Sequence, residues 1–151
     1  MALQSKHYDV VVIGAALVGA SAALGLAKQG FRVALVDIKA PASASTDPAV
    51  WDSRIYAISP GNVDWLGQIG AWKHINQARV TSIDGMHVWA DANSLPLSFD
   101  ASDAHVENLG VILENSCLHQ ALWDELETLD VDVMLNAQCA AIDFGIESAD
   151  I

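Results

Sequence analysis

The chain has 151 residues, of which 52% are hydrophobic and 17% charged, a composition typical of a globular domain and unlike that of a disordered chain. Nineteen acidic against seven basic side chains give a formal net charge of -12, which argues against a nucleic-acid partner because a phosphate backbone would be repelled. No zinc-ligand or HExxH spacing is present, so the sequence predicts no metal site. Cys117 and Cys139 are expected to be buried, reduced thiols.

The first 37 residues predict a strand, a helix and a second strand. Residues 10–13 are an uninterrupted apolar run, as in a parallel strand covered on both faces. Residues 17–29 follow with a helical pattern, and Gly30 is placed as the left-handed cap. The face expected to lie on the sheet consists of Gly19, Ala22, Ala23 and Leu26. Residues 32–37 are the second strand, parallel to the first through a right-handed crossover.

The same stretch could be mistaken for a membrane span or a signal peptide. Residues 10–27 carry no charge. This segment is close to the length that a helix needs to cross a bilayer. However, the run changes from β-branched residues to an Ala-rich helical pattern and is punctuated by glycine and serine. A strand, a turn and a helix explain this change, whereas a single spanning helix does not.

The middle of the chain predicts a loop, a helix and several strands. Residues 38–50 are rich in Ala, Ser and Pro and indicate a loop. Ser59 followed by Pro60 indicates the start of a helix that ends near Gly70. Asp84-Gly85 predicts a hairpin turn between flanking alternating strands. Further strands are expected at residues 95–99 and 109–113.

The last part of the chain predicts a helix followed by two strands. Apolar residues recur at helical spacing over residues 115–129, and residues 131–135 and 139–144 have the pattern of strands. The predicted stripe of the helix consists of Leu118, Ala121, Leu122, Leu126 and Leu129.

The turn after the first strand carries a nucleotide-binding pattern, with Gly14, Ala16 and Gly19 as G-x-A-x-x-G and Asp37 ending the second strand. In this pattern the glycines make the turn and allow close packing, while the helix N-terminus attracts a pyrophosphate. Ala16 stands where the pattern usually has its middle glycine. Its methyl group narrows the space through which the pyrophosphate approaches the backbone. A carboxylate at Asp37 suits ribose hydroxyls and repels a 2′-phosphate, which favours FAD or NAD over NADP. A structural βαβ unit without a nucleotide is the alternative.

Two further segments carry a family resemblance. One is D-x-R-x-x-A-[IL]-S, with Asp52, Arg54, Ala57 and Ser59; the other is L-G-x-x-[LIV]-E-N, which ends at Glu114 and Asn115. From about Tyr8 to Leu129, the chain resembles the N-terminal portion of the aromatic-ring flavin monooxygenases. It is most similar to the ubiquinone-biosynthesis hydroxylases, the polyprenyl-phenol hydroxylase branch.

The resemblance implies an FAD-dependent hydroxylase, in which NAD(P)H reduces the flavin and one oxygen atom is transferred to a phenol ring. The cofactor-binding residues that it implies are Gly14, Ala15, Ala16, Val18, Gly19, Asp37, Arg54 and Asn115. Arg54 would lie against the pyrophosphate or the flavin ring, where its charge offsets that of the phosphates. The alternatives are a surface ion pair of Arg54 with Asp52 or Asp47, and a plain N-cap role for Asn115. Catalytic residues are not indicated.

The expected fold is α/β, a Rossmann-like FAD-binding βαβ domain followed by the start of a mixed or antiparallel substrate-domain sheet. The βαβ unit covers residues 8–37, the partial substrate-domain strands about 79–105, and the cofactor-side strand and helix about 109–129. The segments that the family places further along are not found, so the chain is expected to be an incomplete FAD-binding domain and inactive alone.

The expected substrate is a phenol or polyprenyl-phenol. The expected location is the cytoplasm, without a transmembrane segment; peripheral association with the inner membrane, association with other enzymes and self-association of the chain remain open. Two other functions also remain open, an NAD-binding reductase or dehydrogenase and a non-catalytic nucleotide-binding module.

Overall fold

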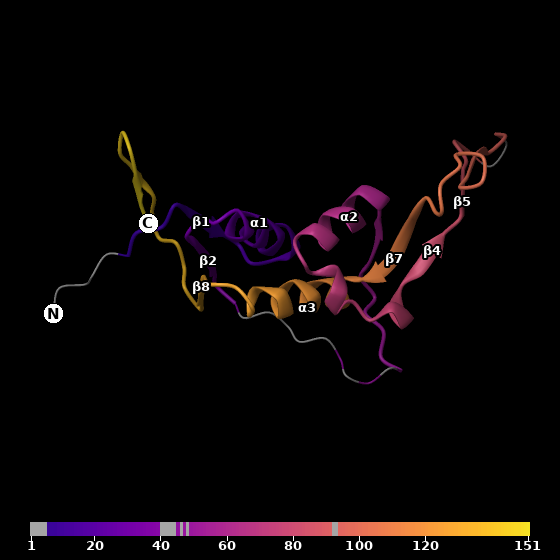
Figure 1. Cartoon of the computed structure of the whole chain (residues 1–151). Helices are drawn as coiled ribbons and strands as arrows, with labels where there is room; N and C mark the ends of the chain where they lie inside the picture. The colour runs from indigo at the N-terminus through magenta and orange to yellow at the C-terminus, as the bar shows by residue number, and fades with distance from the viewer. Residues whose placement is uncertain (1–5, 40–44, 46, 48, 92–93) are drawn as a thin grey trace. The chain divides into compact units, whose positions relative to one another are not determined.

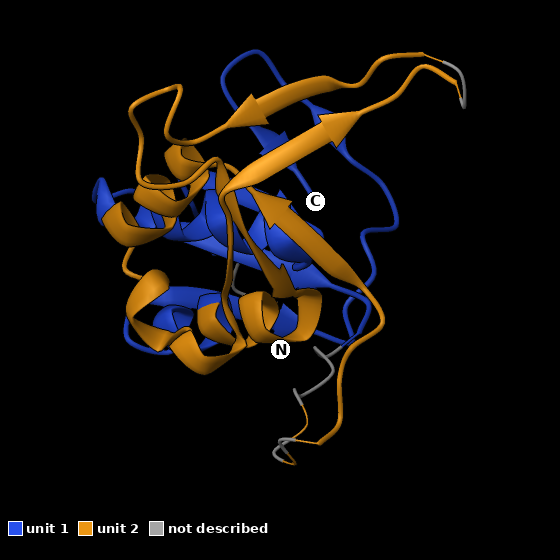
Figure 2. Cartoon of the chain, turned by 90° about the vertical axis from the view of Figure 1, so that its right-hand side faces the viewer, with its two compact units in different colours: residues 1–43, 122–151 blue, residues 44–121 orange. Residues whose placement is uncertain are grey.

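A computed structural model describes residues 6–39, 45, 47, 49–91 and 94–151. They divide into two compact units, shown in different colours in Figure 2. Unit 1 comprises residues 1–43 and 122–151, and unit 2 comprises residues 44–121. Most of the loop predicted at residues 38–50 lies outside the described residues.

Unit 1 is built on a parallel sheet, seen at β1, β2 and β8 in Figure 1. Strands β1 (Val10–Ile13), β2 (Val33–Asp37) and β8 (Val131–Leu135) lie in the order β1-β2-β8. Val10 is paired with Val33, and Val33 with Val131. Residues 33–36 in the central strand are all buried, which agrees with the unbroken apolar pattern of this strand. The predicted parallel βαβ unit is confirmed.

Helix α1 (Leu17–Lys28) connects β1 to β2. Its buried residues are Ala20, Ala23 and Leu24. Ala22, predicted to lie on the sheet, is exposed, because the buried stripe passes through Ala20 and Leu24 instead. Gly30 has a φ of +88°, the left-handed conformation predicted for the residue that ends this helix.

The second part of unit 1 departs from the prediction after β8. Only β9 (Asp143–Phe144) and its antiparallel partner β10 (Ala149–Asp150) are strands there, so the strand predicted over residues 139–144 is wrong for its first four residues. Asn136 has a φ of 55°, and the Ala137 N–H donates to the Asp37 carbonyl at 3.1 Å. The chain therefore turns at the end of the sheet, and residues 139–142 have no strand beside them.

Helix α3 (Asn115–Leu126) ends in unit 1, three residues before the predicted end. Four of the five residues in its predicted stripe are buried, from Leu118 to Leu126. Glu125, only 2% exposed, accepts a hydrogen bond from Lys28 Nζ at 2.7 Å. This ion pair joins the last turns of α1 and α3 within unit 1, and it compensates the cost of burying the carboxylate.

Unit 2 contains an antiparallel sheet in the order β3-β7-β4, formed by β3 (Ile55–Ile58), β7 (Gly110–Glu114) and β4 (Thr81–Ile83). Helix α2 (Pro60–Gln68) follows β3 and is capped by Ser59, whose hydroxyl accepts from the Asn62 N–H. The start predicted from Ser59-Pro60 is therefore confirmed. Two short 3-10 helices, η1 (Trp72–His74) and η2 (Gln77–Arg79), lead to β4.

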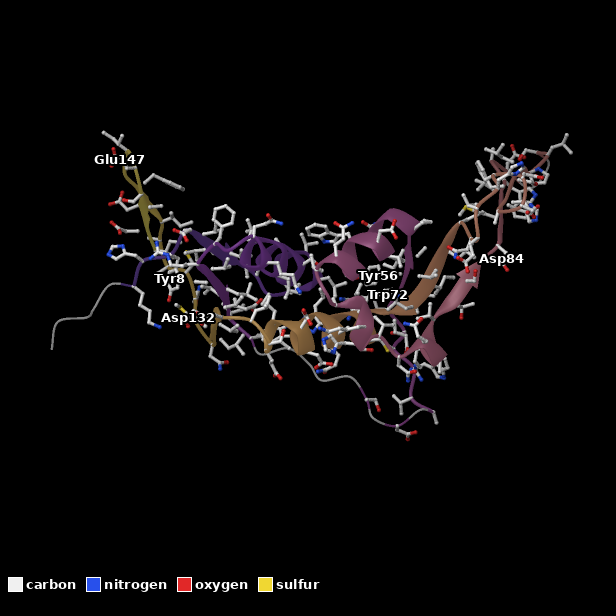
Figure 3. All side chains as sticks on the ribbon, viewed as in Figure 1. Tyr8, Tyr56, Trp72, Asp84, Asp132 and Glu147 are labelled. Carbon is white, nitrogen blue, oxygen red and sulfur yellow. The ribbon has the colours of Figure 1, made fainter. Side chains whose placement is uncertain are left out.

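The hairpin predicted at Asp84-Gly85 is wrong. Strand β4 pairs with β7, whereas β5 (Gly85–Val88) pairs with β6 (Leu97–Asp100). Asp84 therefore lies where the chain passes from one sheet to another, as its position in Figure 3 shows. Neither Asp84 nor Gly85 has a positive φ, although a two-residue type I′ turn needs one at both central positions. The strand expected at residues 95–99 begins two residues later, at Leu97.

Candidate nucleotide-binding site and the second motif cluster

The turn after β1 has the geometry that the glycine pattern predicted. Gly14 has a φ of +101°, which a residue with a side chain rarely adopts. Its N–H donates to the Val36 carbonyl at 2.8 Å. The first glycine is therefore held at the carboxyl end of the parallel sheet, where ligands bind in sheets of this type.

Gly19 brings the helix into direct backbone contact with this turn. A Cβ added at Gly19 would lie 1.8 Å from the Gly14 carbonyl oxygen, far inside any allowed contact. The third glycine of the pattern is thus required for packing, as its position predicted.

The N-terminus of α1 faces outward without a side-chain cap. Ala16 is the N-cap residue and makes no side-chain hydrogen bond. Val18, in the first turn, is 84% exposed. Because the first N–H groups of a helix have no intrahelical acceptor, this end of α1 offers amide donors and the positive end of the helix dipole to an anion.

Asp37 lies beside the turn, and its carboxylate is bonded to the backbone of the turn, which the sequence did not indicate. Its Oδ2 accepts the Ala15 N–H at 2.6 Å, and its Oδ1 accepts the Lys39 N–H at 2.9 Å. Ala15 is only 3% exposed, so its amide serves this internal bond. Since each carboxylate oxygen can accept more than one hydrogen bond, Asp37 can hold the turn and still accept from a hydroxyl.

The opposite end of the unit 1 sheet, at the amino ends of its strands, carries a different group of polar residues. Tyr8 and Asp132 lie side by side there in Figure 3, and the Tyr8 hydroxyl donates to the Asp132 carboxylate. Asp132 also accepts from Lys6 Nζ at 2.6 Å. An open cavity of about 650 Å³ is lined partly by these residues and Arg32. It lies at the amino ends of the strands, away from Gly14, and is therefore not the predicted nucleotide site.

In unit 2 the two family motifs meet through the pairing of β3 with β7. Ile55 is the partner of Glu114 in the antiparallel register, so the residues before β3 lie beside those that follow β7. The Asn115 N–H donates to the Arg54 carbonyl at 2.9 Å. The Ser116 N–H donates to Asp52 Oδ2 at 3.0 Å, so Asp52 caps the start of α3.

Arg54 and Asn115 are therefore neighbours within unit 2, as the predicted site requires. Arg54 is exposed, and its guanidinium bonds to none of the described residues. The alternative ion pair with Asp52 or Asp47 does not occur. The pKa of Asp52 is lowered, first by the Arg54 N–H and then by donors of Ser116 and Asn115. Asn115 is the first residue of α3, and its side chain is the last of the donors that lower the pKa of Asp52.

Sequence reasoning missed the cation that completes this cluster. Glu114 is 2% exposed, and Arg79 donates to it through Nε at 2.6 Å and Nη2 at 2.7 Å. This guanidinium holds the pKa of Glu114 below its usual range. The signal that could have found it is a carboxylate ending a buried apolar strand, because such a group needs a cationic partner.

Other predicted features fall outside these clusters. Cys117 and Cys139 are free thiols, but both are only partly buried. In the described part of the chain, no three His, Cys, Asp or Glu side chains gather as metal ligands would. Among the described helices, none combines the length and apolar character needed to cross a bilayer.

The fold and the glycine turn define a class, the dinucleotide-binding proteins with a Rossmann-like βαβ unit. Residues 9–51 match the family model described as FAD dependent oxidoreductase, which confirms the assignment to FAD. Among solved structures, the chain resembles a probable FAD-dependent monooxygenase from Pseudomonas aeruginosa, with a TM-score of 0.69, 18% identity, and coverage of 94% of this chain and 36% of that one. At this identity the likeness supports the fold alone.

The curated proteins that this chain matches in sequence include ubiquinone-biosynthesis hydroxylases. The chain is 34% identical to 3-demethoxyubiquinol 3-hydroxylase of Escherichia coli over 125 residues, which are 83% of this chain and 32% of the relative. It is 30% identical to a mitochondrial ubiquinone biosynthesis monooxygenase of Caenorhabditis elegans over 141 residues, 89% of this chain and 31% of the relative. The chain is therefore homologous to these hydroxylases over most of its own length, and the predicted resemblance is confirmed. It spans about a third of the length of the curated relatives it matches.

Proposed function

We propose that the chain binds FAD and forms part of an FAD-dependent monooxygenase that hydroxylates the aromatic ring of a phenolic ubiquinone precursor, with NAD(P)H as electron donor. The observation that carries the proposal is the combination of the Gly14–Gly19 backbone contact with Asp37 at the end of β2. This combination lies inside the segment that matches the FAD dependent oxidoreductase family.

The residues of unit 1 fit the ADP end of FAD. The uncapped start of α1 would donate amides to the pyrophosphate, and the exposed Ala16 leaves only a methyl group at this surface. Asp37 would accept from a ribose hydroxyl while still holding the Ala15 amide. Ala15 would act by placing the turn, because its amide already has an acceptor.

Arg54 and Asn115 in unit 2 are the other residues that we propose to bind the cofactor. Arg54 is exposed and uncommitted among described residues, so it can neutralise phosphate charge or lie against the flavin. Asn115 would be a polar neighbour of the cofactor. When bound, FAD supplies electron transfer and oxygen activation, and the chain supplies binding, orientation and charge.

The test is a titration of the chain with FAD, followed by flavin fluorescence, with ADP, NAD and NADP as competitors. We expect ADP to compete and NADP to compete poorly, because the Asp37 carboxylate would repel a 2′-phosphate. Preference for NAD over FAD would favour a reductase or dehydrogenase instead. No binding of any nucleotide would overturn the proposal and leave a structural βαβ unit.

We further propose that the strands at residues 79–105 belong to a substrate domain and that the chain self-associates through them. Strand β5 exposes Met86 and Val88, which are cross-strand partners of Phe99 and Leu97 in β6. Paired apolar side chains on one face of an isolated hairpin favour association. A cytoplasmic location, with peripheral attachment to the inner membrane or to other enzymes, is part of the same proposal. Light scattering over a range of protein concentrations tests self-association. We expect the Leu97→Lys variant to remain monomeric at concentrations where the parent chain associates.

A further inference from the structure

The five residues 50–54, here called the 50–54 segment, have no helix or strand, yet hydrogen bonds fix them along their length. The Val50 carbonyl accepts from Arg79 Nη2 at 2.9 Å. The Asp52 N–H donates to Glu114 Oε1 at 2.6 Å. The Arg54 N–H donates to Asp52 Oδ1 at 2.9 Å, and the Arg54 carbonyl accepts the Asn115 N–H at 2.9 Å.

Two charged side chains, Glu114 and Arg79, make two of these four hydrogen bonds. Glu114 and Arg79 form the bidentate ion pair described above, with side-chain exposures of 2% and 14%. The Arg79 guanidinium also lies 3.8 Å from the centre of the Trp51 ring, a distance suited to a cation–π contact. The pair therefore contacts three successive residues, Val50, Trp51 and Asp52, just before Arg54.

A buried ion pair is a weak explanation for stability by itself, because apolar residues of similar volume often serve as well. What apolar residues cannot do is bind a backbone N–H and a backbone carbonyl of an irregular segment. The pair does both, at Asp52 and at Val50. Its particular effect is thus to fix the backbone that leads to Arg54.

The Asp52 carboxylate is occupied in the same arrangement. It accepts the N–H groups of Arg54 and Ser116, and it makes no ion pair with the Arg54 guanidinium. The backbone of Arg54 is held at both its N–H and its carbonyl, while its charged end extends from an exposed residue without a bond to the described residues. A fixed backbone whose charged end has no bond to the described residues is the arrangement expected of an anion-binding residue.

We propose that Glu114 and Arg79 are positioning residues for anion binding by Arg54. They act through the 50–54 segment to hold the Arg54 guanidinium for the negatively charged part of the cofactor. This inference rests on the proposed function, since it assigns the anion to FAD.

The experiment is a double-mutant cycle on FAD binding with Arg54→Ala, Glu114→Gln and the double variant. We expect Arg54→Ala and Glu114→Gln each to weaken FAD binding by about tenfold, the scale of one charge-assisted hydrogen bond. Added to Arg54→Ala, Glu114→Gln should have no further effect, because it acts only through Arg54. Glu107→Gln makes the same charge change at an exposed residue and should leave the dissociation constant unchanged.

A second readout separates positioning from a general loss of structure. If Arg54 binds an anionic group of FAD, the affinity for FAD should fall as the salt concentration rises. Glu114→Gln should reduce this salt dependence as much as Arg54→Ala does. Arg79→Lys keeps the charge but loses the bidentate contact, and it should reduce the salt dependence in part if the chain remains folded.

The outcomes are distinguishable. Failure of the parent chain to bind FAD would overturn the proposed function, and this inference with it. If the parent binds FAD but the losses of the two single variants multiply in the double variant, the positioning role is wrong. It is also wrong if Glu114→Gln binds as the parent does, or if Glu114→Gln and Arg79→Lys both unfold, since the pair would then serve stability alone.

Discussion

Replacing Gly19 by Ala tests the closest contact in the nucleotide-binding unit. The added Cβ would lie 1.8 Å from the Gly14 carbonyl oxygen, whereas real Cβ contacts stay above 3.0 Å. The two backbones must therefore separate by at least about 1.2 Å, the difference between these distances. This displacement approaches the rise of one helical residue, about 1.5 Å, and overpacking of this kind costs about 1–3 kcal/mol of unfolding free energy.

The same displacement should weaken FAD binding. A donor moved by more than 1 Å no longer reaches a phosphate oxygen, and the loss of one or two charge-assisted bonds at about 1.5 kcal/mol each corresponds to about 10- to 100-fold in the dissociation constant. Flavin fluorescence titration gives this constant, and urea unfolding gives the change in stability. Gly67→Ala is the matched control, because a Cβ in this α2 position meets nothing within 4 Å. An unchanged dissociation constant together with the parent's urea midpoint in Gly19→Ala would refute the reasoning.

Four other results are expected. Asp37→Ala should weaken adenine-nucleotide binding by about 1–3 kcal/mol, and equal affinity by titration calorimetry would remove Asp37 from the site. Gly14→Val should abolish binding, because φ is +101° there; a folded variant that binds normally would contradict the nucleotide hypothesis. Arg32 lowers the pKa of Asp9 to about 2 from 3.8, so the stability that this pair gives is complete above pH 3.8 and is lost as the pH falls toward 2. Asp9→Asn should therefore flatten the acid-unfolding curve over that interval, as followed by circular dichroism. The 151-residue chain alone, supplied with FAD, NADH and oxygen, should yield no hydroxylated phenol by mass spectrometry, since it spans about a third of its relatives.

The βαβ unit could be predicted almost to the residue because its determinants are local. An unbroken apolar run, a glycine turn and a small-residue helix each specify their own structure, and β1 has the predicted bounds. The Asp84-Gly85 turn failed for the opposite reason. A D-G pair between alternating strands predicts a hairpin only if the two strands pair with each other, but β4 pairs with β7, which lies more than twenty residues further along the chain.

The site could be predicted as a set of residues but not as a set of contacts. The nucleotide-binding pattern placed Asp37 beside the glycine turn. Nothing in the sequence showed that the Asp37 carboxylate accepts a hydrogen bond from the Ala15 amide. Arg79 was missed because it belongs to neither motif, and only the tertiary pairing of β3 with β7 shows why Glu114 needs it. Partners of buried charges depend on long-range packing, which periodicity does not report.

The motif residues of this chain differ in which of their groups make contacts within the fold. Gly19 and Asp37 serve the fold directly, through the backbone contact with Gly14 and the bond to Ala15. Arg54 differs, because the fold engages its backbone on both sides and leaves its guanidinium unbonded to the described residues. A substitution that keeps the backbone but removes the side chain should therefore cost little stability at Arg54 and more at Asp37. This contrast means that binding measurements on Arg54 variants report on the ligand, whereas those on Asp37 variants must be corrected for loss of fold.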